Sequence, residues 1–187
     1  MKKISISVSE VKTLLESLEE NEVTIKEILD FISDKKSKQN KDIFNKMSLV
    51  IDYSQNLKQM IIAGHYDWVN GNITESNFPF PKSLKGDELL VSAKLFYFDC
   101  LISSEDVIAK MDKSSYRPAN LTELLALGAE QPYLQKRFPI VALNSNFYDT
   151  FNELSVPVLI FDKGLRKLDL RCFNHDWLGF CFLGVHK

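Results

Sequence analysis

Apolar residues in the first part of the chain recur at the spacing of an amphipathic helix. One stripe begins at Val11 and a second at Ile25, and a hydroxyl residue, Ser7 or Thr24, precedes each of them and stands three positions before a glutamate. In such a capping box the hydroxyl accepts a hydrogen bond from the third helical amide, and the glutamate bonds back to the cap amide. The spacing therefore predicts two helices that begin near Ser7 and Thr24.

A third apolar stripe at helical spacing follows, and Gly64 stands after it at the position of a left-handed C-cap. We therefore expect a third helix that ends at this glycine. Three amphipathic helices must bury their apolar faces on each other, on the rest of the chain or on a second copy, and the sequence leaves these arrangements open. The members of the third stripe are Phe44, Met47, Val50, Ile51, Ser54, Leu57 and Ile61.

Composition changes sharply after residue 64. All six prolines and six of the seven glycines lie beyond this point. Because proline and glycine mark turns and loops, this part of the chain should be turn-rich and mixed in secondary structure. We therefore expect two domains, a helical segment over residues 1–64 and a mixed domain over residues 65–187.

Within the mixed domain, β-rich apolar residues predict strands at 86–100 and 138–145. Two helix starts are predicted, at Ser103 and Asn120, because acidic residues occupy the first turn that follows each of them. Gly128 is expected to end the second helix.

The last 32 residues, 156–187, read as strands almost throughout. The runs "VPVLIF" and "LRKLDLRCF" flank a turn at Gly164, a residue that readily adopts the positive φ of a tight hairpin turn. The run "GFCFLGV" predicts one more strand at the end. Such an apolar tail is expected where the last strand is paired inside a sheet.

Net charge and the absence of long apolar runs limit the classes of partner. The chain carries a formal net charge of −2, which argues against nucleic acid as the main partner, since its readers usually carry clustered basic residues. Neither a secretory leader nor an apolar run of membrane-spanning length is readable, so we expect a cytoplasmic protein without membrane contact.

Cys100, Cys172 and Cys181 lie in apolar surroundings and should be reduced, buried thiols.

Two separated blocks carry a family resemblance. Residues 102–129 resemble formylglycine-generating-enzyme-like domains, in which a "V-S-W-x-D-A" helix is followed by "R-L-P-T-x-x-E-W-E-x-A". Residues 165–187 are similar to the closing strands of variable proteins of diversity-generating retroelements, which share a C-type-lectin-like fold. The positions that match the first block are Ser103, Asp106, Arg117, Pro118 and Glu123.

The resemblance covers roughly residues 65–187 and implies an α+β protein: a helical N-terminal segment followed by a C-type-lectin-like mixed domain with small antiparallel sheets. Such domains bring their two termini together and present irregular loops for binding. The chain departs from the pattern at four positions. Cys181, Gly184 and His186 stand where arginine, alanine and arginine are usual, and Ser104 replaces the tryptophan of "V-S-W".

The resemblance also assigns candidate binding residues. In retroelement variable proteins the stretch before the final strand carries the ligand-facing positions. We therefore expect a non-catalytic binding protein that recognises a macromolecular partner, a protein, through its loops. The ligand-binding candidates are Asn174, His175, Asp176 and Phe180, with Asn144, Asn146 and Tyr148 from an earlier loop as a second group.

Two alternatives remain open. The enzyme branch of the family oxidises a substrate cysteine with two close thiols, which would make Cys172 and Cys181 the pair of a thiol- or copper-dependent oxidase. Phenylalanine neighbours both residues, which favours packed structural thiols, and His175–Asp176 lacks a third ligand at metal-site spacing, so we expect no metal or cofactor. The second alternative is an assembly or inhibitory effector, of phage or mobile-element type, that acts or forms a homo-oligomer through residues 1–64.

Overall fold

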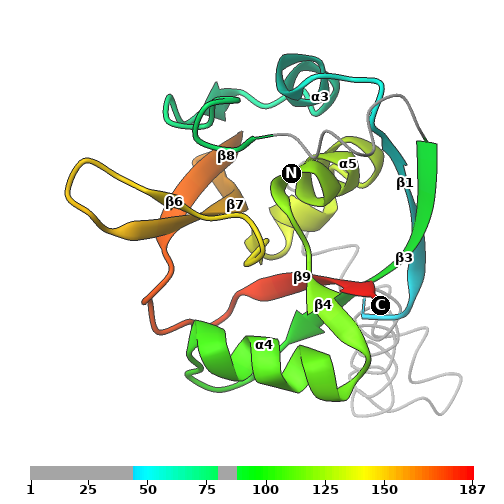
Figure 1. Cartoon of the computed structure of the whole chain (residues 1–187), viewed down its shortest axis with the longest axis vertical. Helices are drawn as coiled ribbons and strands as arrows, with labels where there is room; N and C mark the ends of the chain where they lie inside the picture. Colours follow the sequence, from blue (N-terminus) through cyan, green and yellow to red (C-terminus); the bar gives the residue numbers. More distant parts are fainter. Residues whose placement is uncertain (1–43, 80–87) are drawn as a thin grey trace, which may run out of the picture. The chain divides into compact units, whose positions relative to one another are not determined.

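A mixed sheet of nine strands frames the part of the chain that the computed structural model describes, residues 44–79 and 88–187. The strands follow the spatial order β1-β3-β9-β5-β7-β8-β2, while β4 pairs with β9 and β6 pairs with β7 (Figure 1). The helices expected near Ser7 and Thr24 lie outside the described residues. The strands are β1 (Met47–Asp52), β2 (Trp68–Val69), β3 (Glu88–Tyr97), β4 (Tyr116–Pro118), β5 (Ile140–Val141), β6 (Phe147–Tyr148), β7 (Leu154–Asp162), β8 (Leu165–Cys172) and β9 (Cys181–His186).

The helices of the described residues are α3 (Leu57–Ala63), α4 (Ser104–Lys113) and α5 (Leu121–Glu130), with a short 3-10 helix, η2 (Leu134–Lys136). Both predicted helix starts are confirmed. The Asp106 amide donates to the Ser103 hydroxyl over 3.2 Å at the start of α4. Asn120 and Glu123 form a complete capping box at the start of α5, with two hydrogen bonds of 2.9 Å.

Strand β9 lies in the middle of the sheet, as the apolar tail predicted. On one edge it pairs antiparallel with β3, and on the other it pairs parallel with β5 and antiparallel with β4. Its residues Cys181 to Val185 are all buried. The last strand is therefore enclosed by its neighbours and covered on both faces.

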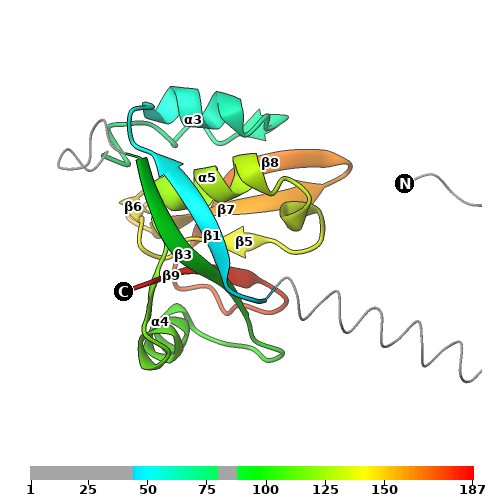
Figure 2. The ribbon, with the colours of Figure 1, turned by 90° about the vertical axis from the view of Figure 1, so that its right-hand side faces the viewer.

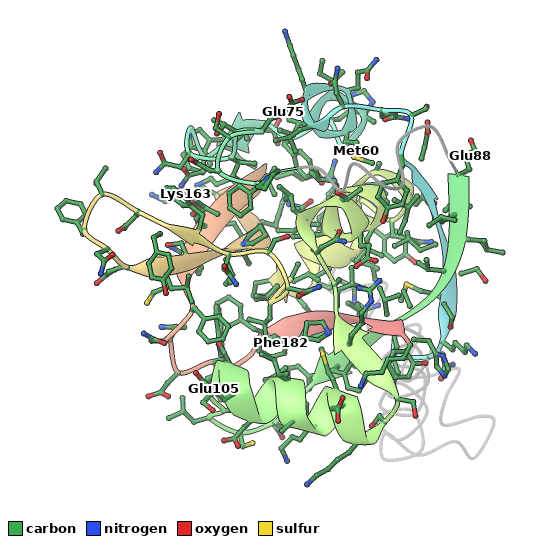
Figure 3. The ribbon with its side chains drawn as sticks, viewed as in Figure 1. Met60, Glu75, Glu88, Glu105, Lys163 and Phe182 are labelled. Carbon is green, nitrogen blue, oxygen red and sulfur yellow. The ribbon has the colours of Figure 1, made fainter. Side chains whose placement is uncertain are left out.

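Helices α4 and α5 lie on opposite sides of β9 (Figures 1 and 2). Phe182 of β9 lies between β9 and α4 (Figure 3) and belongs to one buried cluster with Phe96 of β3 and with Val107 and Met111 of α4. On the other side, α5 buries four leucines and contacts β1, β7 and α3. No helix within residues 44–79 and 88–187 is long and apolar enough to cross a membrane.

The predicted hairpin is confirmed. Strands β7 and β8 pair antiparallel along their whole length, from Ser155 opposite Cys172 to Asp162 opposite Leu165. The two residues between them, Lys163 and Gly164, have φ angles of 51° and 86°. Positive φ at both central positions matches the turn twist to the twist of the strands, so the glycine is used as expected.

The predicted third helix is wrong in its first half. Residues 47–52 form strand β1, in which Leu49 and Ile51 are buried while Val50 between them is 45% exposed. The helix begins only after Asn56, whose side chain forms a capping box with Gln59. Because β1 pairs with β3, the compact unit begins at Phe44, ahead of the expected boundary at residue 64.

Two glycines differ from their predicted conformation or position. Gly64 ends α3 as expected, but its φ is −74° rather than left-handed, and the positive φ after α3 belongs to His65, at 48°. Gly128 does not end α5, which continues to Glu130. Side-chain atoms of Tyr66 lie where a Cβ atom of either glycine would stand, so both residues allow the close approach of this ring.

The sheet also differs from the expected small antiparallel sheets. It contains parallel pairs, β5 with β9 and β2 with β8, within one continuous order of strands. The strand expected over residues 138–145 is reduced to Ile140–Val141. The Ala142 amide still donates to the Pro157 carbonyl of β7, but the Asn144 amide donates to the Ala119 carbonyl, so the chain turns away from β7 after Ala142.

Arg166 of β8 links three helical segments to the sheet. Its guanidinium donates to the carbonyls of Gly64 over 2.5 Å and Gly128 over 2.7 Å, and its Nε donates to Oε1 of Gln135 over 3.1 Å. The guanidinium carbon also lies 5.1 Å from the ring centroid of Tyr66. Carbonyls near helix C-termini lack intrahelical partners and attract cations, so this one side chain satisfies groups on α3, α5 and η2.

We predict that Gly128→Ala destabilises the unit by about 2 kcal/mol, because the added methyl group meets the Tyr66 hydroxyl. Helix propensity alone predicts the opposite sign, a gain of about 1 kcal/mol. Urea unfolding of the full chain measures the difference.

The Tyr66 hydroxyl is buried and has no hydrogen-bond partner among the described residues. Tyr66→Phe should therefore cost little by itself and should recover most of the stability lost in Gly128→Ala. A double variant as unstable as Gly128→Ala would contradict this account.

Candidate functional site

The loop between β8 and β9, residues 173–180 and called here the tail loop, is anchored by a buried tryptophan. Trp177 is 1% exposed. Its backbone exchanges two hydrogen bonds with Ile102, of 2.9 and 3.1 Å, and its indole N–H donates to the Ser104 hydroxyl over 2.8 Å. The middle of this irregular loop is thus fixed to the start of α4.

Ser104 connects the anchor to the start of the tail loop. The serine is buried, and its hydroxyl, which accepts from Trp177, donates in turn to the Phe173 carbonyl over 2.5 Å. The Phe173 amide donates to the Leu154 carbonyl of β7 over 2.6 Å. Because its anchor groups are buried and paired, the tail loop has a defined backbone without regular secondary structure.

Three of the predicted contact residues lie together on the outside of this loop. Asn174, His175 and Asp176 are all exposed. The His175 ring stands edge-on to Trp177 and Phe180, with centroids 5.0 and 6.1 Å apart. Phe180 itself is half-buried and packs against the core cluster, so it supports the loop as well as bordering the surface.

The second predicted group is divided. Tyr148 is 61% exposed on β6 and pairs with Leu154, the same residue whose carbonyl accepts from Phe173, so Tyr148 and the tail loop flank the start of β7. Asn144 and Asn146 instead line a separate pocket of about 330 Å³ at the N-terminal end of α5. The seven predicted residues therefore do not form one site.

A groove beside Phe180 was not predicted. It has a volume of about 410 Å³ and is formed by η2, the residues before β5, and the hairpin β7–β8. We call it the cationic groove, because four basic and two acidic side chains line it. These are Lys136, Arg137, Lys167, Arg171, Asp162 and Asp169. The available signal in the sequence was the crowding of three of the chain's four arginines between positions 137 and 171.

The three cysteines are free thiols in different surroundings. The expectation that all three are buried is wrong for Cys100, which is exposed, and Cys172 is only partly covered. Burial raises the pKa of Cys181 to about 12. A thiol with such a pKa stays protonated at neutral pH, whereas a redox-active or metal-binding cysteine needs an accessible thiolate.

The exposed amide, imidazole and carboxylate of the tail loop can donate and accept hydrogen bonds on one small surface, a chemistry suited to recognition. Within residues 44–79 and 88–187, no three His, Cys, Asp or Glu side chains are grouped so that they could hold a metal ion.

Comparisons of the chain with models of known protein families, with curated proteins and with solved structures found no match.

We predict that a thiol reagent such as Ellman's reagent modifies Cys100 rapidly in the native protein and leaves Cys181 unmodified until the protein unfolds. Raising the pH to about 9 should not make Cys181 reactive, since its thiol stays protonated at this pH. Mass spectrometry of the modified peptides identifies each site. Rapid native modification of both Cys172 and Cys181 would instead favour the oxidase alternative.

We predict that Ser104→Ala lowers the free energy of unfolding by about 1–3 kcal/mol, because the Trp177 indole N–H and the Phe173 carbonyl lose a buried partner. Amide hydrogen exchange across residues 173–180 should accelerate more than exchange in β9. Ser114→Ala, at the exposed end of the same helix, is the matched control and should change neither quantity appreciably. Unchanged exchange in the tail loop would show that Ser104 does not fix it.

Proposed function

We propose that this protein is a non-catalytic binding protein that recognises a protein partner through the tail loop of a C-type-lectin-like domain. The observation that carries the proposal is the arrangement of this loop. Asn174, His175 and Asp176 are exposed on a backbone fixed from beneath by the buried, hydrogen-bonded Trp177.

A fixed loop favours binding on energetic grounds. Ordering a flexible loop on association costs free energy that must be subtracted from the contacts it makes, and a loop held in place before binding avoids most of that cost. Asparagine and histidine side chains adapt their hydrogen bonds to a partner's surface, while aromatic rings such as that of Tyr148 supply contact area at low entropic cost. The tail loop and the start of β6 offer both kinds of group.

The order of the elements supports the C-type-lectin-like assignment. The block that resembles the family, residues 102–129, contains α4, β4 and the greater part of α5, and the closing hairpin and last strand follow it. Two matched residues form a bidentate pair: the Arg117 guanidinium donates to both carboxylate oxygens of Glu123, over 2.6 and 2.9 Å. The first and last strands of the unit, β1 and β9, both pair with β3, which agrees with neighbouring termini.

Two departures from the family pattern have local physical reasons. A Cβ atom at Gly184 would lie 2.7 Å from Cε2 of Phe96, so alanine would not fit there without a shift of this ring. Ser104 replaces a tryptophan and accepts the indole N–H of Trp177. At these two positions the space beside β9 and α4 is therefore occupied by Phe96 and Trp177. The order of the elements agrees with the resemblance.

We predict that the triple variant Asn174→Ala, His175→Ala, Asp176→Ala binds its partner at least about tenfold more weakly than the wild type, because three central contact groups are removed. The partner is first identified by quantitative pull-down from the native cell and then purified for titration. Phe180 is left in place, since its packing on Trp177 would confound binding with stability.

The matched control is Lys58→Ala on α3 with Glu75→Ala, two exposed residues at the other end of the unit from the tail loop (Figures 1 and 3). Both variants should melt within a few degrees of the wild type. Equal affinity of the triple variant and the wild type would remove the tail loop from the binding surface and refute the proposal.

A further inference from the structure

We propose that the cationic groove binds an acidic segment of the partner, one in which carboxylate side chains stand beside an apolar side chain. This inference rests on the proposed function, because it takes the groove as an extension of the same binding surface. Phe180 is the link, since it borders the groove and packs beneath the tail loop against Trp177.

The sign of the groove's charge is opposite to that of the chain. Four basic and two acidic side chains line the groove, whereas the chain as a whole has a formal net charge of −2. A local excess of one sign on a surface of the other sign attracts complementary groups and repels like ones. The occupant should therefore be anionic.

Both acidic side chains of the groove already have partners. The Lys167 ammonium lies 2.7 Å from Oδ2 of Asp162. Oδ1 of Asp169 accepts from the Asn70 side-chain amide over 2.9 Å and from the Leu170 amide over 2.8 Å, and Oδ2 lies 3.8 Å from Arg171. Both carboxylates are therefore already engaged within the protein, and the four basic side chains of the groove outnumber them.

Two of the cations lie over phenylalanine rings. Nζ of Lys136 is 5.8 Å from the ring centroid of Phe161, and Cζ of Arg137 is 5.9 Å from that of Phe138. A ring face does not cancel the charge of the Lys136 ammonium that lies over it. The groove therefore combines positive groups with apolar surface, and a ligand that matches it must combine carboxylates with an apolar side chain.

The size of the groove fits a short segment. Its volume of about 410 Å³ is in the range of about 300–1,000 Å³ found for small-ligand pockets, which leaves room for a few side chains. Single-stranded nucleic acid also binds to basic and aromatic surfaces. A nucleic acid strand carries a charge at every phosphate, whereas four basic against two acidic side chains match only a few carboxylates, so the peptide is favoured and the oligonucleotide is included as an alternative outcome of the test.

The test uses a short fluorescein-labelled peptide that alternates glutamate with leucine, titrated with the full chain and followed by fluorescence anisotropy. A peptide of the same length that alternates glutamine with leucine, and a labelled oligothymidylate, are titrated in parallel. We expect the glutamate peptide to bind most tightly and to weaken as salt is raised, because exposed charge pairs are screened. Amide chemical shifts of Phe161, Arg171 and Phe180 should move on binding.

The double variant Lys136→Gln with Arg171→Gln should bind the glutamate peptide about five- to tenfold more weakly, since two exposed charge pairs with the peptide are lost. Lys58→Gln with Lys113→Gln removes the same charge from exposed positions that do not line the groove and should leave the affinity within about twofold. Thermal melts verify that both variants fold.

The inference is overturned if the glutamine peptide binds as tightly as the glutamate peptide, if the oligothymidylate binds more tightly, or if the groove variant binds like its control. The triple alanine variant of the tail loop keeps every charged residue of the groove and should still bind the glutamate peptide. Peptide binding and partner capture are separate measurements, so a failure of either one is distinguishable from a failure of the other.

Discussion

The enclosure of β9 is the constraint on which the rest of the structure depends. A strand buried on both faces must have its backbone groups paired on both edges, because an unpaired amide or carbonyl away from water is costly. Strand β3 satisfies one edge, and β5 and β4 divide the other. The amide of Cys181 also donates to the Pro139 carbonyl over 2.8 Å. This pairing fixes one end of the tail loop and places Phe180 beside the cationic groove.

Local signals in the sequence were sufficient where the structure is itself decided locally. The capping residues Ser103 and Asn120 and the turn at Gly164 act through neighbours within a few positions, and all three were predicted correctly. Strand β1 was predicted as a helix because its apolar residues fit a helical spacing and an alternating one equally well. Its partner, β3, which decides between the two, is distant in sequence. The role of Gly128 was misread because the ring of Tyr66, which leaves no room for a Cβ atom there, is also distant in sequence.

The candidate site also combines features that depend on sequence neighbours with features that depend on distant residues. Exposure of Asn174, His175 and Asp176 could be predicted, since polar residues between two apolar strands lie in a loop. The cationic groove could not, because its lining comes from three separate stretches that only the pairing of β7 with β8 and β5 brings together. The order of the elements thus determines which side chains line the groove as much as any single motif does.

The position of β9 also has a consequence for how the protein is made. Ala93 and Val185 are paired although about ninety positions separate them, and such distant contacts slow folding. While a ribosome synthesises the chain, β3 and β5 must wait for their common neighbour until residues 181–186 have been added. The edges of β3 and β5 are open to pairing with other nascent chains during this interval, so the growing polypeptide is most vulnerable to aggregation just before its central strand arrives.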